Sequence, residues 1–304
     1  MELNRLDKRA RERILPTLVG EGVPRLTGWG EVVSCFSRAV NARHSQGLLV
    51  SFVEETRAMT YLSVCLPALF QKPRHGLVPG NQVRFDGHRV IMEDFVVDFL
   101  GRPTWQGKIT LGDVKGFCAS RVTLLKESLL LKGRDGGFLG LLRGGQPNNP
   151  FVARAMDLLR GDRSAASRSV RLNALSSLVG LGPGSTPSGD DFVAGVLLGE
   201  EALRLLPSTE AKAVADNLEP MIPWSEEKED LWIAVNRTTD AGKTLLWQAL
   251  HGQFPNFLIE TIRCVSAAKG KQEIAEAVDS AVACGATSGT DALTGFVFCM
   301  ETRI

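Results

Sequence analysis

The chain lacks the long uninterrupted run of apolar residues that a membrane-spanning helix requires. Its N-terminal segment is charged and has no apolar core of the kind found in secretion signals. It also lacks an excess of charge, because its formal net charge is +1 and gives no strong basic field for nucleic acid or an anionic membrane. We therefore expect a cytoplasmic protein that binds no nucleic acid and no membrane.

Histidine is scarce and cysteine is scattered. The 304 residues include four histidines and six cysteines, with no Cys-x-x-Cys pair and no His-Glu-x-x-His sequence. This pattern is typical of reduced, mostly buried thiols and argues against a zinc site. Cys284 is a conceivable nucleophile, but no histidine lies near it in the sequence, so packing is the favoured interpretation of this thiol.

The composition is that of an ordinary globular protein, with 44% hydrophobic and 23% charged residues. Short strand-like runs fill residues 28–110, and Asp86-Gly87 within 82–92 is typical of a type I′ hairpin turn. After about residue 115 the apolar period becomes helical. The sequence thus predicts an α+β fold, with a small β-rich, antiparallel, barrel-like region over residues 1–115 and a larger all-helical domain over residues 116–304.

The most informative stretch is Gly180-Leu-Gly-Pro-Gly-Ser-Thr-Pro-Ser-Gly-Asp-Asp-Phe192. Its three alternate glycines indicate a backbone that turns sharply, and Ser188 is predicted to cap the apolar helix that follows. A glycine loop before a helix presents N–H groups at the positive end of the helix dipole, which favours a phosphate or a carboxylate. The Lys-Ser/Thr ending of an ATP-binding P-loop is missing, so ATP is not the expected ligand.

Part of this stretch recurs 100 residues later, since Ser188-Gly-Asp-Asp191 with Gly195 corresponds to Ser288-Gly-Thr-Asp291 with Gly295. The recurrence indicates either a duplicated helical unit or repeated use of one capping arrangement. In a capping box, Asp191 and Asp291 would each bond back to the start of their own helix. Capping gives no role to Asp190. This carboxylate could hold a cation, act as a base or interact favourably with the positive end of the helix dipole.

The string Gly-Leu-Gly-Pro-Gly-Ser-Thr-Pro-Ser-Gly-Asp-Asp-Phe resembles the signature of a bacterial family, first defined as a domain of unknown function, that includes AllH, a subunit of oxamate carbamoyltransferase. Thr238-Thr239 with the leucines and glycine that follow, and Thr287 to Gly295, resemble the same family. The resemblance covers about residues 175–300. The chain departs from the family pattern at three positions, with Ser185 in place of Leu, Gly242 in place of Ser and Thr290 in place of Trp.

This resemblance implies a multi-subunit enzyme of allantoin and purine breakdown. Such an enzyme transfers a carbamoyl group between oxalurate-like ureides and phosphate, and gives oxamate and carbamoyl phosphate. These species are small anions, which is the ligand class that the glycine loop favours. The implied partners are other subunits of the complex and a small anionic metabolite. A second copy of the chain is a further candidate partner.

Two hypotheses follow for the motifs. In the first, Asp190, Asp191 and Asp291 are catalytic and the two motifs form one pocket for an anion, with Mg²⁺ as a candidate cofactor although no metal-ligand set is defined. The ligand-binding residues would then be Gly182, Gly184, Ser185, Thr186, Ser188, Gly189, Thr238, Thr239, Ser288 and Gly289. In the second, the chain is a non-catalytic assembly subunit whose glycines and Ser/Asp pairs only pack and cap buried helices. A stand-alone Mg²⁺-dependent enzyme acting on a phosphorylated metabolite is a third, weaker alternative.

Overall fold

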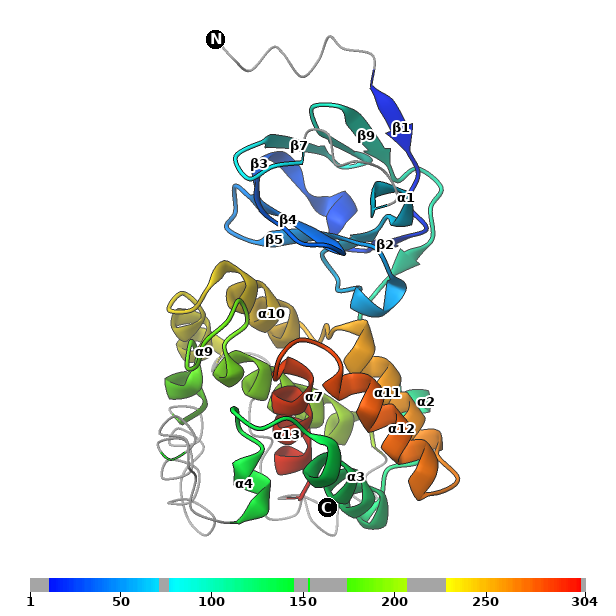
Figure 1. Ribbon diagram of the computed structural model, residues 1–304, viewed down its shortest axis with the longest axis vertical. Helices are drawn as coiled ribbons and strands as arrows, with labels where there is room; N and C mark the ends of the chain where they lie inside the picture. Colours follow the sequence, from blue (N-terminus) through cyan, green and yellow to red (C-terminus); the bar gives the residue numbers. More distant parts are fainter. Residues whose placement is uncertain (1–10, 71–76, 145–152, 154–173, 207–227, 302–304) are drawn as a thin grey trace. The chain divides into compact units, whose positions relative to one another are not determined.

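The computed structural model describes residues 11–70, 77–144, 153, 174–206 and 228–301. It divides into two compact units, residues 1–107 and residues 108–304. The first unit is built on a β-sheet and the second on helices (Figure 1), which confirms the predicted α+β fold.

The first unit is a curled sheet (Figure 1). Its ten strands are in the order β1-β9-β8-β7-β3-β4-β5-β6-β2-β10. Most neighbouring strands are antiparallel, but β1 and β9, β5 and β6, and β2 and β10 are parallel pairs. The strands are Glu12–Ile14 (β1), Leu18–Gly20 (β2), Thr27–Cys35 (β3), Ala39–His44 (β4), Leu49–Val53 (β5), Ser63–Cys65 (β6), Gln82–Asp86 (β7), Arg89–Ile91 (β8), Phe95–Asp98 (β9) and Thr104–Trp105 (β10). Three single turns accompany them, namely Val23–Arg25 (η1), Thr56–Ala58 (η2) and Pro67–Phe70 (α1).

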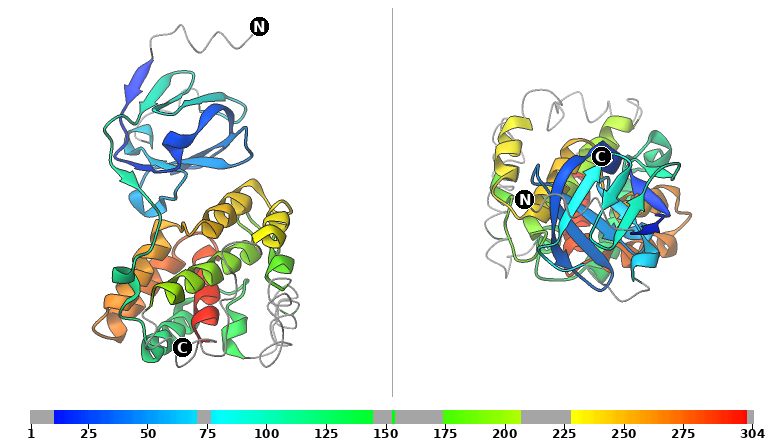
Figure 2. Two further views of the ribbon diagram at one scale, coloured as in Figure 1. Left: turned by 180° about the vertical axis from the view of Figure 1, so that it is seen from behind. Right: turned by 90° about the horizontal axis from the view of Figure 1, so that it is seen from above.

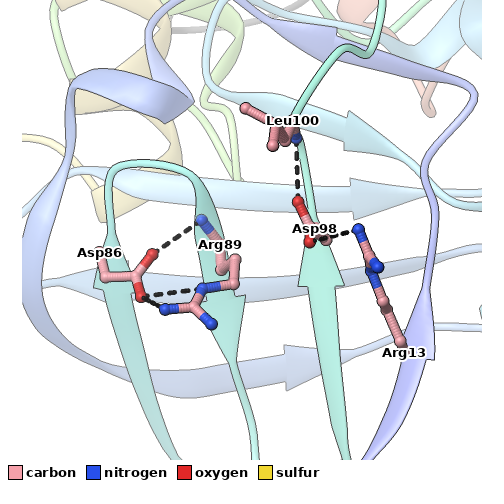
Figure 3. A network of polar contacts seen from close by, with 5 residues as sticks. All are labelled: Arg13, Asp86, Arg89, Asp98 and Leu100. Carbon is pink, nitrogen blue, oxygen red and sulfur yellow. Dashed lines mark hydrogen bonds and ion pairs between the residues drawn. The ribbon is translucent and has the colours of Figure 1, made fainter.

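The hairpin of β7 and β8 is present, but its turn differs from the prediction. Among the described residues only glycines have a positive φ, and in this turn that residue is Gly87 at +81°. A type I′ turn requires a positive φ at both central residues, so the type I′ prediction is wrong. Asp86 stabilises the turn, because its carboxylate accepts hydrogen bonds from the Arg89 backbone N–H at 2.9 Å and from the guanidinium at 2.8 Å (Figure 3).

The edge strand β1 is joined to β9 by an ion pair as well as by the backbone. Arg13 Nη2 lies 2.7 Å from Asp98 Oδ2, and the other carboxylate oxygen of Asp98 accepts the Leu100 N–H at 3.0 Å (Figure 3). Beneath this polar surface, alternate side chains of the strands, such as Val83, Phe85 and Val97, are buried and form the core of the unit.

The second unit contains the helices Leu111–Val114 (α2), Ala119–Lys132 (α3), Gly140–Arg143 (α4), Ser188–Leu205 (α7), Lys228–Val235 (α9), Asp240–Leu250 (α10), Asn256–Ala267 (α11), Lys271–Val282 (α12) and Ser288–Glu301 (α13). Helices α7 and α13 lie side by side in the middle of this unit (Figures 1 and 2) and are buried over most of their length. Helices α3, α4, α11 and α12 pack against α13, while α2 and α10 pack against α7. No helix in the described part of the chain is long and apolar enough to cross a membrane.

Glycines explain how closely α7 and α13 approach each other. A Cβ atom at Gly195 would overlap the carbonyl oxygen of Ala292, and a Cβ atom at Gly295 would overlap that of Phe192. These two contacts are equivalent in the 100-residue repeat, and further along the helices Gly199 faces Cys299. The two helices are therefore parallel and related by a local pseudo-twofold axis. Parallel packing brings both of their N-termini to the same end of the unit.

Candidate functional site

Three helices begin at one place. The Thr186 and Ser288 hydroxyl oxygens are 3.1 Å apart, and the Ser188 and Thr287 hydroxyl oxygens are 3.3 Å apart, so the starts of α7 and α13 are joined. The start of α10 is attached by Thr239, whose hydroxyl donates a hydrogen bond to the Ser185 carbonyl. The positive ends of three helix dipoles therefore converge, which creates a favourable environment for negative charge.

The glycine loop has the backbone that its sequence predicts. Gly180, Gly182 and Gly184 all have a positive φ, and a Cβ atom at Gly182 would lie 3.0 Å from the Ser188 nitrogen. The second loop repeats this arrangement, because Gly285 has a φ of +66° and a Cβ atom there would lie 2.9 Å from Ser288 Oγ. Each helix start is thus approached closely by a glycine of the loop before it.

Gly189 and Gly289 serve the packing of these loops. Their N–H groups donate to the carbonyls of Leu181 at 2.8 Å and Cys284 at 3.2 Å, so both N–H groups are used within the protein. A Cβ atom at either position would overlap a backbone carbonyl of the preceding helical segment. Their contribution to the site is therefore the close approach of backbone to backbone.

The predicted capping by Ser188 is wrong. Pro187 occupies the cap position of α7 and Ser188 is the first helical residue, with its hydroxyl directed to Thr287. Asp291 likewise does not bond back to Ser288, since its Oδ1 accepts the Phe138 N–H at 2.6 Å. By contrast with α7, α10 has a side-chain cap, because Thr239 Oγ1 accepts the Gly242 N–H at 3.0 Å.

Asp190 is fully buried and fastens the glycine loop to two helices. Its Oδ1 accepts the Gly180 N–H at 2.7 Å, and its Oδ2 accepts the hydroxyl hydrogen of Thr238, just before α10. Burial raises the pKa of Asp190, and the two hydrogen bonds oppose this rise. A Cβ atom at Gly242 would overlap the Asp190 carboxylate, so the glycine leaves room for this buried acid.

Asp191 and Asp291 form two equivalent groups. Each is almost fully buried and its Oδ2 atom has no hydrogen-bond partner. Burial raises the pKa of Asp191 well above its ordinary value, and the negative charges of Asp291 and Asp190 add to the rise, whereas hydrogen bonding to Ser288 and Thr186 lowers it. Burial also raises the pKa of Asp291, which hydrogen bonds from Phe138 and two hydroxyls lower.

The hydroxyls around these two acids follow the pseudo-twofold axis. Asp191 faces Thr186, which precedes its own helix, and Ser288 from the other helix. Asp291 faces Thr287, which precedes its own helix, and Ser188 from the other helix. We call these the Asp191 triad (Asp191, Thr186, Ser288) and the Asp291 triad (Asp291, Thr287, Ser188).

The site is layered from solvent inward. Ser185, Thr239, Gly285 and Ala286 form an exposed rim; Thr186, Thr238, Thr287 and Ser288 are half-buried; Ser188 and the three acids are buried. A molecule from solvent would therefore meet hydroxyl groups first, with the carboxyl groups beneath them. The sequence-predicted site residues all lie in this one region, although they come from segments far apart in the chain.

The segment before α4 contributes residues that the sequence did not indicate. The Arg134 guanidinium donates hydrogen bonds to the carbonyls of Gly285 at 2.7 Å and Ala286 at 3.3 Å, which places a positive charge at the rim. Its backbone N–H donates to Thr290 Oγ1 at 3.0 Å, and a Cβ atom at Gly137 would overlap the Asp291 carboxylate. About 150 residues separate this segment from α13, and neither sequence carries a motif that links them.

Within the described ranges, no group of three or more His, Cys, Asp or Glu side chains is arranged to hold a metal ion. Asp190 is bonded to an N–H and a hydroxyl, while Asp191 and Asp291 are surrounded by hydroxyls. The candidate Mg²⁺ therefore has no assigned ligand set, and the arrangement is one of hydrogen-bond donors and buried acids.

Residues 178–300 match the model of the family described as oxamate carbamoyltransferase subunit AllH. The matched range contains both motifs and helices α7, α10 and α13, and it confirms the resemblance inferred from the signature. No match was found among curated proteins or among solved structures.

Proposed function

Because residues 178–300 match the AllH family, whose description is a subunit of oxamate carbamoyltransferase, we propose that this chain is a subunit of a carbamoyltransferase-type complex. Its partners are then other subunits of that complex, and its chemistry is carbamoyl transfer between an oxalurate-like ureide and phosphate. The site that serves this chemistry is the convergence of α7, α10 and α13.

The observation that carries the proposal is the pair of triads at two parallel helix starts. Oxalurate, oxamate, phosphate and carbamoyl phosphate all carry a carboxylate or a phosphate group, which helix dipoles and hydroxyl donors stabilise. Carbamoyl transfer can proceed when an enzyme holds two anions together and stabilises the oxyanion charge that develops between them. Neither requirement calls for an activated nucleophile.

The residues divide into two roles under this proposal. The hydroxyls of Ser185, Thr186, Ser188, Thr287 and Ser288 contact the ligand. Asp191 and Asp291 lie beneath them and set the directions of the hydroxyls of Thr186, Ser188, Thr287 and Ser288. Asp190 holds Gly180 of the glycine loop and Thr238 in place. Gly182 and Gly184 shape the loop that brings the hydroxyls together.

The assembly hypothesis also has a specific observation in its favour. Gly189, Gly195, Gly289 and Gly295 each allow a contact with a backbone carbonyl, so much of both motifs serves helix packing. Packing does not explain why two buried carboxyl oxygens remain without partners, because such groups destabilise a fold. The anion site is therefore favoured over packing alone.

Thermal unfolding of the full chain tests this proposal. The chain is heated with carbamoyl phosphate, phosphate, oxamate or oxalurate, each with and without Mg²⁺. A ligand present at about one hundred times its Kd stabilises the folded state by about 2.7 kcal/mol, which raises the unfolding midpoint. We expect a shift with at least one of these anions, and its loss in Ser288→Ala. The absence of a shift with every anion would favour the assembly hypothesis.

A further inference from the structure

Two buried carboxyl groups with unpartnered oxygens lie directly under the hydroxyl layer. Asp191 is 5% exposed and Asp291 is 0% exposed, and no described residue completes the hydrogen bonding of either Oδ2 atom. An ionised carboxylate in such a place is destabilised more than a protonated carboxyl, and the protonated carboxyl can also donate a hydrogen bond. The protonation state of the two acids therefore affects the hydroxyls that lie above them.

The number of hydrogens in one triad shows that the protonation state of the acid controls where the hydroxyl hydrogens point. The hydroxyls of Thr186 and Ser288 each have one hydrogen, lie 3.1 Å apart and both face Asp191. When Asp191 is ionised, both hydrogens turn to the carboxylate, and the hydroxyls present only lone pairs to solvent. When Asp191 is protonated, it donates to one hydroxyl, which donates to the other, and the last hydrogen is left for a ligand. The Asp291 triad obeys the same count through Ser188 and Thr287.

We propose that Asp191 and Asp291 are positioning residues that hold at least one proton between them when an anion is bound, and that this proton turns a hydroxyl hydrogen outward. At a pH where the free pair is ionised, an anion therefore binds together with a proton taken from solvent. This inference rests on the proposed anion site and adds to it the coupling of anion binding to protonation. The protonated site favours a ligand group that accepts hydrogen bonds and carries no proton itself.

Among the charged and titratable groups near the pair, Asp190 favours retention of a proton, whereas the positive charges of Arg134 and Lys243 oppose it. Asp190 on α7 adds a third buried carboxyl next to Asp191 and opposes full ionisation. Cys284 lies between α12 and α13, and the Arg134 guanidinium, from the segment before α4, is held at the rim by two carbonyls. From α10, Asp240 and Lys243 lie in its first turn. The helix dipoles also favour the ionised form of the two acids. The balance between their protonated and ionised forms therefore changes with pH.

Sulfate binding measured by titration calorimetry tests the proposal, because the charge of sulfate stays constant above about pH 5, so a change of its binding with pH arises in the protein. Titrations in two buffers of different ionisation enthalpy report the protons taken up. We expect uptake of up to one proton for each triad engaged, and an affinity that falls by up to about tenfold per pH unit above the pKa of the pair for each proton taken up.

The Asp191→Asn, Asp291→Asn double variant replaces both acids with fixed donors. We expect it to bind sulfate without proton uptake and, at alkaline pH, more tightly than the unmodified chain. Asp279→Asn, on the exposed side of α12, is the matched control and should keep the original pH dependence. Sulfate binding to the unmodified chain that keeps its affinity and takes up no proton even at alkaline pH would overturn this inference and leave the anion site standing. No binding at any pH to the folded chain would overturn the anion site and this inference with it.

Discussion

Asp190 and Asp191 are neighbours in the chain, yet their carboxyl oxygens differ in hydrogen bonding. The sequence suggested that capping accounts for Asp191 and Asp291 and leaves Asp190 unexplained. In the structure Asp190 has both oxygens bonded, whereas Asp191 and Asp291 each have an oxygen without a partner. Local spacing predicted a bond within each helix, but the hydroxyls that face each acid come partly from the other helix, which no local pattern records.

Asp191→Asn should stabilise the chain, and more so at higher pH. The folded-state pKa of Asp191 lies well above its ordinary value of 3.8, so the folded chain binds this proton more tightly than the unfolded chain. Stability therefore falls as pH rises from the ordinary pKa to the raised one, and each pKa unit corresponds to about 1.4 kcal/mol. Asparagine has no charge to bury and removes this loss.

Unfolding in urea at several pH values measures the effect. We expect the difference in unfolding free energy between Asp191→Asn and the original chain to grow with pH and then become constant above the raised pKa. A difference that does not change with pH would contradict the raised pKa of this carboxyl.

At the scale of elements, α7 and α13 form a pair that the sequence repeat partly predicted. The recurrence of Ser-Gly, Asp and Gly at a fixed offset correctly indicated two helices that begin alike. The parallel packing and the pseudo-twofold axis could not be predicted from the sequence. They depend on contacts between Gly195 and Ala292 and between Gly295 and Phe192, which lie about 100 residues apart.

Gly195→Ala tests the close packing of these helices. The new methyl group would meet a backbone carbonyl, which cannot turn aside as a side chain can, so α7 and α13 must separate. We expect a loss of about 1–3 kcal/mol or more in the free energy of unfolding. Gly112→Ala on α2 is the control, because its methyl group would meet only ordinary contacts, and there we expect no loss of stability.

Chemical denaturation of both variants gives the comparison. Equal stability of Gly195→Ala and the original chain would show that the two helices do not pack as closely as described here. A similar loss in both variants would indicate that alanine is unfavourable at helical glycines of this chain in general.

At the scale of the whole molecule, the chain is a curled sheet unit and a helical unit, as its change of apolar period predicted. The order of the ten strands could not be predicted, because strands such as β1 and β9 pair across more than 80 residues. The helical unit has its own core, centred on α7 and α13, and contains every residue of the candidate site.

We therefore expect residues 108–304 to fold when produced alone and to keep the anion site. Calorimetry of this fragment should show one cooperative unfolding transition, and the fragment should respond to the same anions as the full chain. A fragment without a cooperative transition would show that the helical unit depends on the sheet unit for its stability.

We propose that hydroxyls at two converging helix starts bind a small anion. Titration calorimetry of carbamoyl phosphate and of oxamate tests this on the full chain and on the folded Thr186→Val, Thr287→Val double variant, because valine keeps the shape of threonine and replaces the hydroxyl with a methyl group. We expect one site per chain, with an affinity at least about tenfold weaker in the variant, which corresponds to about 1.4 kcal/mol. Equal affinities in the two proteins, or no binding of either anion to the original chain, would contradict it.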